Sequence, residues 1–129
     1  MTTIKKFEYL CSVCKNIAGK ITIGERKEDD SIKDYPLKPK FFVKIEGPFS
    51  NPIRFINYDE YSWIRNLLEK NRFQPFYKKY QDNVSFFCPK CFTFYCRNHW
   101  SNFRLFMDQG FYDYSSAVCP KGHEVIVDD

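Results

Sequence analysis

The sequence has no long run of apolar residues and no sign of an N-terminal secretory signal. A helix that crosses a membrane needs about 20 consecutive, mainly apolar residues, and the 129-residue chain contains no such run. Its N-terminus also lacks the apolar core and the small-residue cleavage site of a signal peptide, since it reads MTTIKKFEYLC. We therefore expect an intracellular protein, cytoplasmic or, if eukaryotic, nuclear, that has no membrane partner.

Histidine is scarce, and neither histidine nor cysteine occurs outside four short pairs. Tetrahedral zinc takes four ligands of these types, and a spacing of two or three residues lets a tight turn direct both side chains of a pair at one ion. The six cysteines and two histidines form the pairs Cys11 and Cys14, Cys88 and Cys91, Cys96 and His99, and Cys119 and His123. Eight ligands predict two Zn²⁺ ions per chain.

The same scarcity bears on catalysis. A structural zinc ion is saturated by protein ligands, whereas a catalytic one keeps a position open for water or substrate. Once eight side chains bind zinc, no cysteine or histidine is left as a nucleophile or general base. We expect a non-enzymatic protein with two structural zinc sites and no small-molecule substrate. Two alternatives stay open: three disulfides, because the number of cysteines is even, and one zinc site with the remaining ligands free.

Short periodic segments predict a small α+β domain stabilised by zinc. Asn57 followed by a glutamate three residues later is typical of a helix start, and apolar residues then recur at helical spacing, which predicts the main helix at about 58–70. A short second helix is expected at about 101–109, with Gly110 ending it. Short antiparallel strands are expected at 6–10, 17–23, 41–46, 53–56 and 125–127. Residues 1–129 would form a single zinc-binding domain, with a β-hairpin and helix unit inserted at about 24–87.

The four ligand pairs can be combined into two sites in three ways. Only four residues separate Cys91 from Cys96, so the second and third pairs must lie close in space. They could share one ion, or adjacent pairs could alternate between two ions. Alternation would give one site of Cys11, Cys14, Cys96 and His99 and a second of Cys88, Cys91, Cys119 and His123.

The stretch from Phe87 to His99, FCPKCFTFYCRNH, resembles the core of cross-brace zinc fingers, particularly the AN-one type, the B-box and RING-like fingers. In those fingers a cysteine pair is followed after four residues by an aromatic residue and a second pair. The resemblance favours the alternating ligand sets. The chain departs from these fingers in the 73 residues between its first two pairs.

The resemblance also implies a function, because cross-brace fingers commonly mediate protein contacts, often in ubiquitin-related pathways. We expect an adaptor-like module with a protein partner. A large exposed apolar surface would mark the contact. Candidates for it are Trp100, Phe111, Tyr112 and Tyr114.

Two other functions remain open. The segment 38–104 holds 12 Lys and Arg against 5 Asp and Glu, and a stretch within it interleaves cations with aromatic residues that could stack on bases. The candidate nucleic-acid-binding residues are Arg72, Phe76, Tyr77, Lys78 and Lys79. The third possibility is a RING-like component of a ubiquitin ligase.

Overall fold

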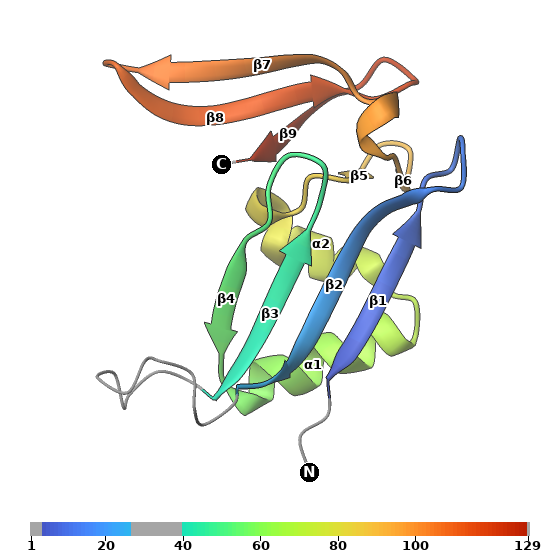
Figure 1. The fold of residues 1–129 in the computed structure, drawn as a ribbon, viewed down its shortest axis with the longest axis vertical. Coiled ribbons are helices and arrows are strands. Elements are labelled where there is room, and N and C mark those ends of the chain that lie inside the picture. The colour runs from blue at the N-terminus through green and yellow to red at the C-terminus, as the bar shows by residue number, and fades with distance from the viewer. Residues whose placement is uncertain (1–3, 27–39, 129) are drawn as a thin grey trace.

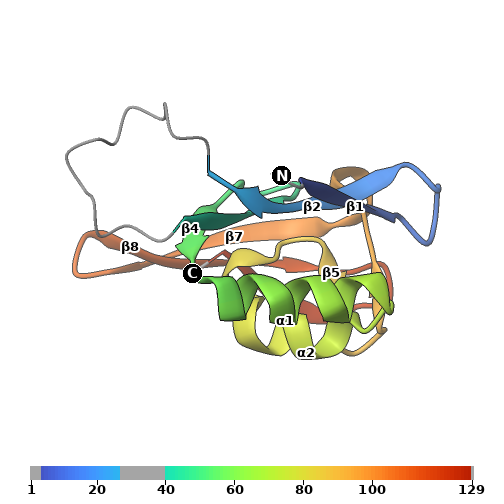
Figure 2. The ribbon, with the colours of Figure 1, turned by 90° about the horizontal axis from the view of Figure 1, so that it is seen from below.

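The computed structural model describes residues 4–26 and 40–128. An antiparallel sheet with the strand order β1-β2-β3-β4 forms the larger part of the fold. Helices α1 and α2 cover one face of this sheet (Figures 1 and 2). The elements are β1 (Lys5–Leu10), β2 (Ile17–Glu25), β3 (Phe41–Glu46), β4 (Ile53–Ile56), α1 (Tyr58–Glu69) and α2 (Phe73–Tyr80). The small α+β architecture is therefore confirmed.

Alternation along β2 and β3 explains why the helices pack where they do. Ile21 lies opposite Ile45, and Ile23 lies opposite Val43, and all four side chains are buried. Successive residues of a strand point to opposite faces, so these four side chains share one face. Ile64 of α1 is fully buried as well, and it belongs to the same apolar cluster.

Helix α1 begins as its sequence predicts. The side chain of Asn57 accepts a hydrogen bond of 2.8 Å from the backbone N–H of Glu60, which satisfies one of the free donors of the first turn. The helix ends at Glu69, and Asn71 takes a left-handed backbone with φ of 56°. This helix was expected at about 58–70, and it differs by one residue from that expectation.

The C-terminal part forms two smaller sheets. β5 (Phe87–Cys88) pairs with β6 (Thr93–Phe94), and a separate sheet has the order β7-β8-β9. The strands of this three-stranded sheet are β7 (Ser101–Asp108), β8 (Phe111–Val118) and β9 (Glu124–Asp128). In Figure 1 the β7–β8 hairpin extends away from the four-stranded sheet, and its tip lies far from the helices.

The expectation of a second helix at about 101–109 is wrong, because this segment is strand β7. Asp108 pairs with Phe111, so Gln109 and Gly110 alone form the turn, with φ of 51° and 85°. Two central residues with positive φ are characteristic of a type I′ hairpin turn, whose twist matches that of the two strands. Gly110 therefore turns a hairpin instead of ending a helix.

The two parts meet at a cluster of aromatic rings. Phe73 of α2 lies within 5.0 Å, ring centre to ring centre, of both Phe87 and Phe94. Tyr9 of β1 lies 4.9 Å from the Phe73 ring. Gly19 leaves room for this cluster, since a Cβ atom there would lie 2.3 Å from the ring of Phe86. The short β5–β6 hairpin is thus fixed to the larger sheet by ring packing.

The unit expected as an insertion at about 24–87 includes residues 27–39, which lie outside the described residues. Within the described part, β3 pairs with β2 and β4 pairs with β3. The hairpin of this unit therefore continues the sheet that β1 and β2 begin. Within residues 4–26 and 40–128, neither α1 nor α2 has the length and apolar character of a membrane-spanning helix.

Candidate metal centres and an adjoining aromatic pocket

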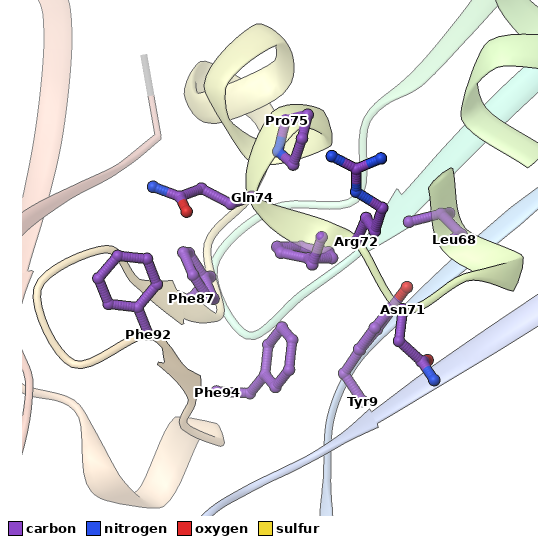
Figure 3. A pocket seen from close by; sticks show the side chains of 10 residues that line it. Tyr9, Leu68, Asn71, Arg72, Gln74, Pro75, Phe87, Phe92 and Phe94 are labelled. Atoms are coloured by element: carbon purple, nitrogen blue, oxygen red, sulfur yellow. The ribbon is translucent and has the colours of Figure 1, made fainter. Parts of the chain in front are cut away.

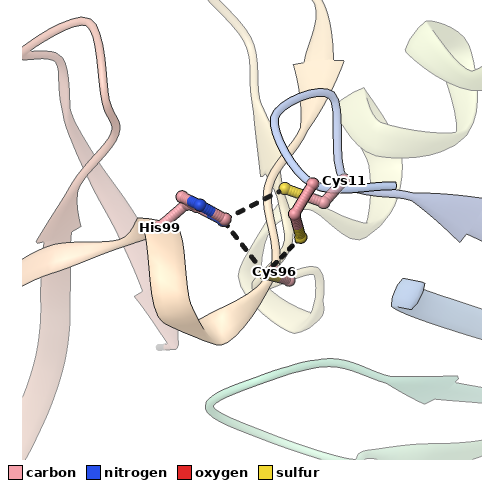
Figure 4. Close-up of side chains that lie close together, drawn as sticks. Cys11, Cys96 and His99 are labelled. Carbon is pink, nitrogen blue, oxygen red and sulfur yellow. Dashed lines mark hydrogen bonds between the residues drawn. The ribbon is translucent and has the colours of Figure 1, made fainter. Parts of the chain in front are cut away.

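Centre 1 brings together residues that are far apart in the sequence. Cys11 and Cys14 lie in the turn between β1 and β2, and Cys96 and His99 follow β6. The Nδ1 atom of His99 lies 3.4 Å from Sγ of Cys11 and 3.2 Å from Sγ of Cys96. The Sγ atoms of Cys14 and Cys96 are 3.6 Å apart. Figure 4 shows Cys11, Cys96 and His99 pointing toward one another.

Centre 2 has the same composition and connects the β5–β6 hairpin to the C-terminal sheet. It consists of Cys88, Cys91, Cys119 and His123. The Nδ1 atom of His123 lies 3.3 Å from Sγ of Cys91, 3.4 Å from Sγ of Cys119 and 3.7 Å from Sγ of Cys88. Cys119 and His123 lie in the turn between β8 and β9, so a metal ion held here would anchor the base of the β7–β9 sheet.

The separations fit a tetrahedral metal ion. With metal–sulfur and metal–nitrogen bonds of the lengths found for zinc, tetrahedral ligands lie ~3.8 Å apart for two sulfurs and ~3.6 Å apart for sulfur and nitrogen. In each centre all four ligand atoms lie within 4.8 Å of one another. All six cysteines are free thiols, so the disulfide alternative does not describe this fold. Each cluster could hold one metal ion.

The backbone of both centres follows the same local pattern. The N–H of Lys15 donates to the carbonyl of Cys11, and the N–H of Phe92 donates to the carbonyl of Cys88, each at 2.9 Å. Lys15 and Phe92 both take positive φ, 66° and 55°. Gly122, between Cys119 and His123, has φ of 88°. These tight turns direct both side chains of a pair to one point.

The thiols differ in how readily they lose their protons before metal binds. Burial raises the pKa of Cys11, but hydrogen bonds from the backbone of Cys14, Cys96 and Val13 outweigh it and lower the pKa to about 6. Burial raises the pKa of Cys88 to about 11. Because metals bind the thiolate, metal binding at centre 2 must release the Cys88 proton.

The grouping of the eight side chains is the alternating one. Cys11 and Cys14 meet the pair that is third along the chain, and Cys88 and Cys91 meet the fourth. Trp100, which directly follows His99, is buried, and its Nε1 donates a hydrogen bond of 2.9 Å to the carbonyl of Tyr95. Trp100 was expected on a protein-binding surface, but its ring packs against Tyr95 instead.

Comparison with known proteins identifies a family. A family model described as "Domain of unknown function (DUF8328)" matches residues 1–129. The chain belongs to this family. No curated protein and no solved structure matches the chain. The chemistry of the DUF8328 domain must therefore be inferred from its own residues.

A pocket of about 520 Å³ lies beside centre 2 in the DUF8328 domain. We call it the aromatic pocket. It is bounded by β1, the turn between α1 and α2, and the β5–β6 hairpin, and Figure 3 shows the side chains that line it. Its walls include the rings of Tyr9, Phe73, Phe87, Phe92 and Phe94, and Arg72 and Gln74 are among its polar members.

The residues expected to bind nucleic acid do not form one surface. Phe76 and Tyr77 are buried, so their rings are not accessible for stacking on bases. Lys79 forms an ion pair with Glu60, and Lys78 is exposed. Of the five, only Arg72 lines the aromatic pocket.

The other residues expected to bind protein lie on the β7–β8 hairpin. Phe111 is 76% exposed next to the hairpin turn, and Tyr112 is 45% exposed. Tyr112 donates a hydrogen bond of 2.7 Å to a carboxylate oxygen of Asp128. Tyr114 stacks on Phe106, with ring centres 4.4 Å apart.

Phe92 is the functional candidate that the sequence did not single out. Its ring is 62% exposed and lines the aromatic pocket. The signal was its position directly after the second cysteine of a Cys-x-x-Cys turn, where the backbone needs positive φ. A bulky side chain is unusual in that conformation.

Proposed function

We propose that the protein is a zinc-binding, non-enzymatic module whose aromatic pocket binds a short peptide segment of a partner protein. In this proposal two structural Zn²⁺ ions hold the pocket walls in place, and the peptide inserts an apolar side chain next to a carboxylate. The observation that carries it is the exposed ring of Phe92 on a left-handed backbone.

Zinc is the ion that the ligands favour. Thiolates and imidazoles are soft or intermediate ligands that suit zinc, and a closed tetrahedral set of four is typical of structural zinc sites. Each cluster offers three thiols and one imidazole. Four protein ligands saturate such an ion, which favours a structural role.

The left-handed backbone of Phe92 costs free energy, and burial of its ring does not compensate for this cost. A left-handed backbone costs roughly 1–2 kcal/mol for a residue with a Cβ atom. The Phe92 ring is more than half exposed, so it contributes little to the core. Strained positions of this kind concentrate at functional sites. Lys15 occupies the equivalent position of centre 1, where the side chain is solvated and lines no such pocket.

The charge of the pocket favours an anionic group on the ligand. No Asp or Glu is among the residues that line it, and burial raises the pKa of Tyr9, which keeps its hydroxyl neutral. Arg72 forms no ion pair with the residues that the structure describes. One cation beside several rings suits a peptide carboxylate next to an apolar side chain.

A peptide suits the pocket better than a nucleic-acid strand does. Binding to single-stranded nucleic acid without sequence preference uses a basic groove along the backbone and several rings for successive bases. Here one arginine lines the pocket, and Phe92 is the one exposed residue among the aromatic residues of its lining. The resemblance of residues 87–99 to cross-brace fingers also favours an adaptor-like role. A ubiquitin-related pathway is an extension of that analogy.

Selection from a phage library of short random peptides on the zinc-loaded protein tests this function. We expect the selected peptides to share an apolar residue near an Asp or Glu. Phe92→Gly should weaken their binding by about tenfold or more, because an exposed aromatic anchor often dominates a small interface. Arg72→Gln should weaken binding less, and mainly at low salt.

Lys15→Gly is the matched control, because it changes the equivalent backbone position and leaves the aromatic pocket intact. It should bind the selected peptides as the unaltered protein does. Equal binding by Phe92→Gly would reject the pocket. Tight binding of a fluorescent oligothymidylate that weakens steeply with salt, in the absence of any enriched peptide, would favour nucleic acid instead.

A further inference from the structure

Strand β7 forms one edge of the three-stranded sheet. The order β7-β8-β9 leaves one side of β7 without a strand partner among the described residues. A free edge presents unpaired N–H and C=O groups that can pair with another strand. In Figure 1 this edge faces away from the helices and the four-stranded sheet.

The side chains of this edge are unusually apolar. Leu105 and Met107 are 61% and 60% exposed, whereas the ring of Phe103 stacks on that of Phe49 between β3 and β4, with ring centres 5.0 Å apart. Because residues two apart share a face of a strand, Leu105 and Met107 project from the same side. Exposed edges are normally short, charged or covered, since they otherwise join other chains. The register of β7 is irregular between Ser101 and Arg104, so the regular edge is residues 104–108, and its two exposed apolar side chains, Leu105 and Met107, favour a partner.

β7 carries only two charged residues, Arg104 and Asp108. They lie on the other face, with Phe106 between them. The Arg104 guanidinium lies 5.0 Å from the centre of the Phe106 ring, which confirms that these two share a face. Within its own chain Arg104 approaches Glu124 at 3.8 Å, and both side chains are more than half exposed. This exposed pair holds Arg104 only weakly.

We propose that β7 pairs with β7 of a second copy of this chain, antiparallel and with the two-fold axis at Phe106. In this register Arg104 of each copy lies opposite Asp108 of the other. Phe106 lies opposite its own counterpart, and Leu105 lies opposite Met107. Both faces are therefore complementary: one has an aromatic pair flanked by two ion pairs, and the other has two apolar pairs.

The charges select this register. When two identical antiparallel strands are related by a two-fold axis, the axis must lie at the level of a residue. An axis midway between two residues would place a residue whose N–H and C=O point toward the other copy opposite a residue whose N–H and C=O point away from it. An axis at Arg104 or at Asp108 would place like charges opposite each other, which is destabilising. Only an axis at Phe106, midway between them, pairs Arg104 with Asp108.

The pairing would create a continuous six-stranded sheet. Because the two strands run in opposite directions, the two bodies would lie at opposite ends of the joined hairpins. No residue of β7 lines the aromatic pocket or belongs to either metal centre, so this inference goes beyond the proposed function and does not depend on it.

Sedimentation velocity of the zinc-loaded protein over a concentration series tests the proposal. We expect a mass that rises from one chain to two. Arg104→Asp should raise the dissociation constant by about tenfold, because it places carboxylates opposite each other at two symmetric positions. Asp108→Arg should do the same with two cationic pairs.

Mixing the two variants tests the charge pairing directly. In a mixed pair, the new carboxylate at position 104 faces the new guanidinium at position 108, and the two unaltered side chains also face each other. The mixture should therefore form a heterodimer, although neither variant associates well alone. The double variant Arg104→Asp with Asp108→Arg should regain self-association.

Glu124→Gln is the control, because it removes the ion pair within the chain without changing the pairing between copies. It should associate as the unaltered protein does, and unchanged metal content should show that each variant is folded. A mass of one chain at every concentration would overturn the proposal. It would also be overturned if the two single variants associated normally, or if their mixture failed to regain association.

Discussion

The four-stranded sheet and the three-stranded sheet of this protein are buried to different extents. Helices α1 and α2 cover the first along its length (Figure 2), and its central side chains, such as Ile21 and Ile45, have almost no exposed surface. In the second sheet Ala117 and Val127 are buried at the base, whereas every residue of β7 is exposed or half-exposed. Apolar burial therefore stabilises the first sheet more than the second, and we expect metal binding at centre 2 to contribute much of the stability of the second.

Removing a metal ligand should give the largest difference in stability between the two sheets. Structural zinc contributes roughly 10–16 kcal/mol of apparent binding free energy in small fingers. We expect Cys119→Ser to lose one zinc ion and to expose the amides of β7, β8 and β9 to hydrogen exchange, while β2 and β3 stay protected. Native mass spectrometry and exchange mass spectrometry measure the two effects.

Cys11→Ser provides the counterpart at centre 1. It should loosen the β1–β2 turn and the segment after β6, and leave the base of the β7–β9 sheet protected. If Cys119→Ser left the exchange of β7–β9 unchanged, centre 2 would not be the anchor of that sheet.

The same truncation in the two regions should give very different losses of stability. Phe76 of α2 is fully buried and stacks on Tyr80, so Phe76→Ala should lower the free energy of unfolding by about 3–5 kcal/mol. Phe111 at the hairpin tip is 76% exposed, and Phe111→Ala should change it by less than about 0.5 kcal/mol. Denaturant unfolding of the zinc-loaded variants gives both values, and similar losses would contradict the comparison.

Two glycines allow a finer test. An added Cβ at Gly19 would meet the buried ring of Phe86 at 2.3 Å, so Gly19→Ala should cost about 1–3 kcal/mol through overpacking. Gly110 has open space around it but φ of 85°, so Gly110→Ala should cost about 1 kcal/mol through backbone strain alone. Thermal unfolding measures both, and a neutral Gly19→Ala would show that the ring cluster can move.

A small gain in stability is expected at the metal turns. Lys15→Gly and Phe92→Gly each relieve a left-handed backbone, with a gain reduced by the greater freedom of glycine in the unfolded chain. We expect each to raise the free energy of unfolding by about 0.5–1 kcal/mol. The calorimetric midpoint should rise similarly for both variants, although only Phe92→Gly should affect peptide binding. A clear loss of stability in Phe92→Gly would instead assign the ring to the core.

Local sequence signals predicted elements whose causes are local. The Asn57 cap and the spacing of apolar residues placed α1 within one residue of its observed end, and alternation located the strands of the larger sheet. The prediction of a helix at about 101–109 was wrong for a physical reason. The spacing of its apolar residues fits a period of two as well as a helical period; these residues are Phe103, Leu105, Phe106 and Met107. The tight turn at Gln109 and Gly110 favours the hairpin.

What the sequence determined by itself is the inventory of ligands and their pairing in twos, because two or three intervening residues suffice to form a turn around one ion. Which pairs share a centre depends on contacts between residues more than 80 positions apart, such as Cys11 and His99, and only the tertiary structure decides it. The same holds for exposure. Trp100, Phe76 and Tyr77 are buried while the Phe92 ring lies in the pocket wall, because burial depends on what the rest of the chain packs against a residue and not on the residue itself.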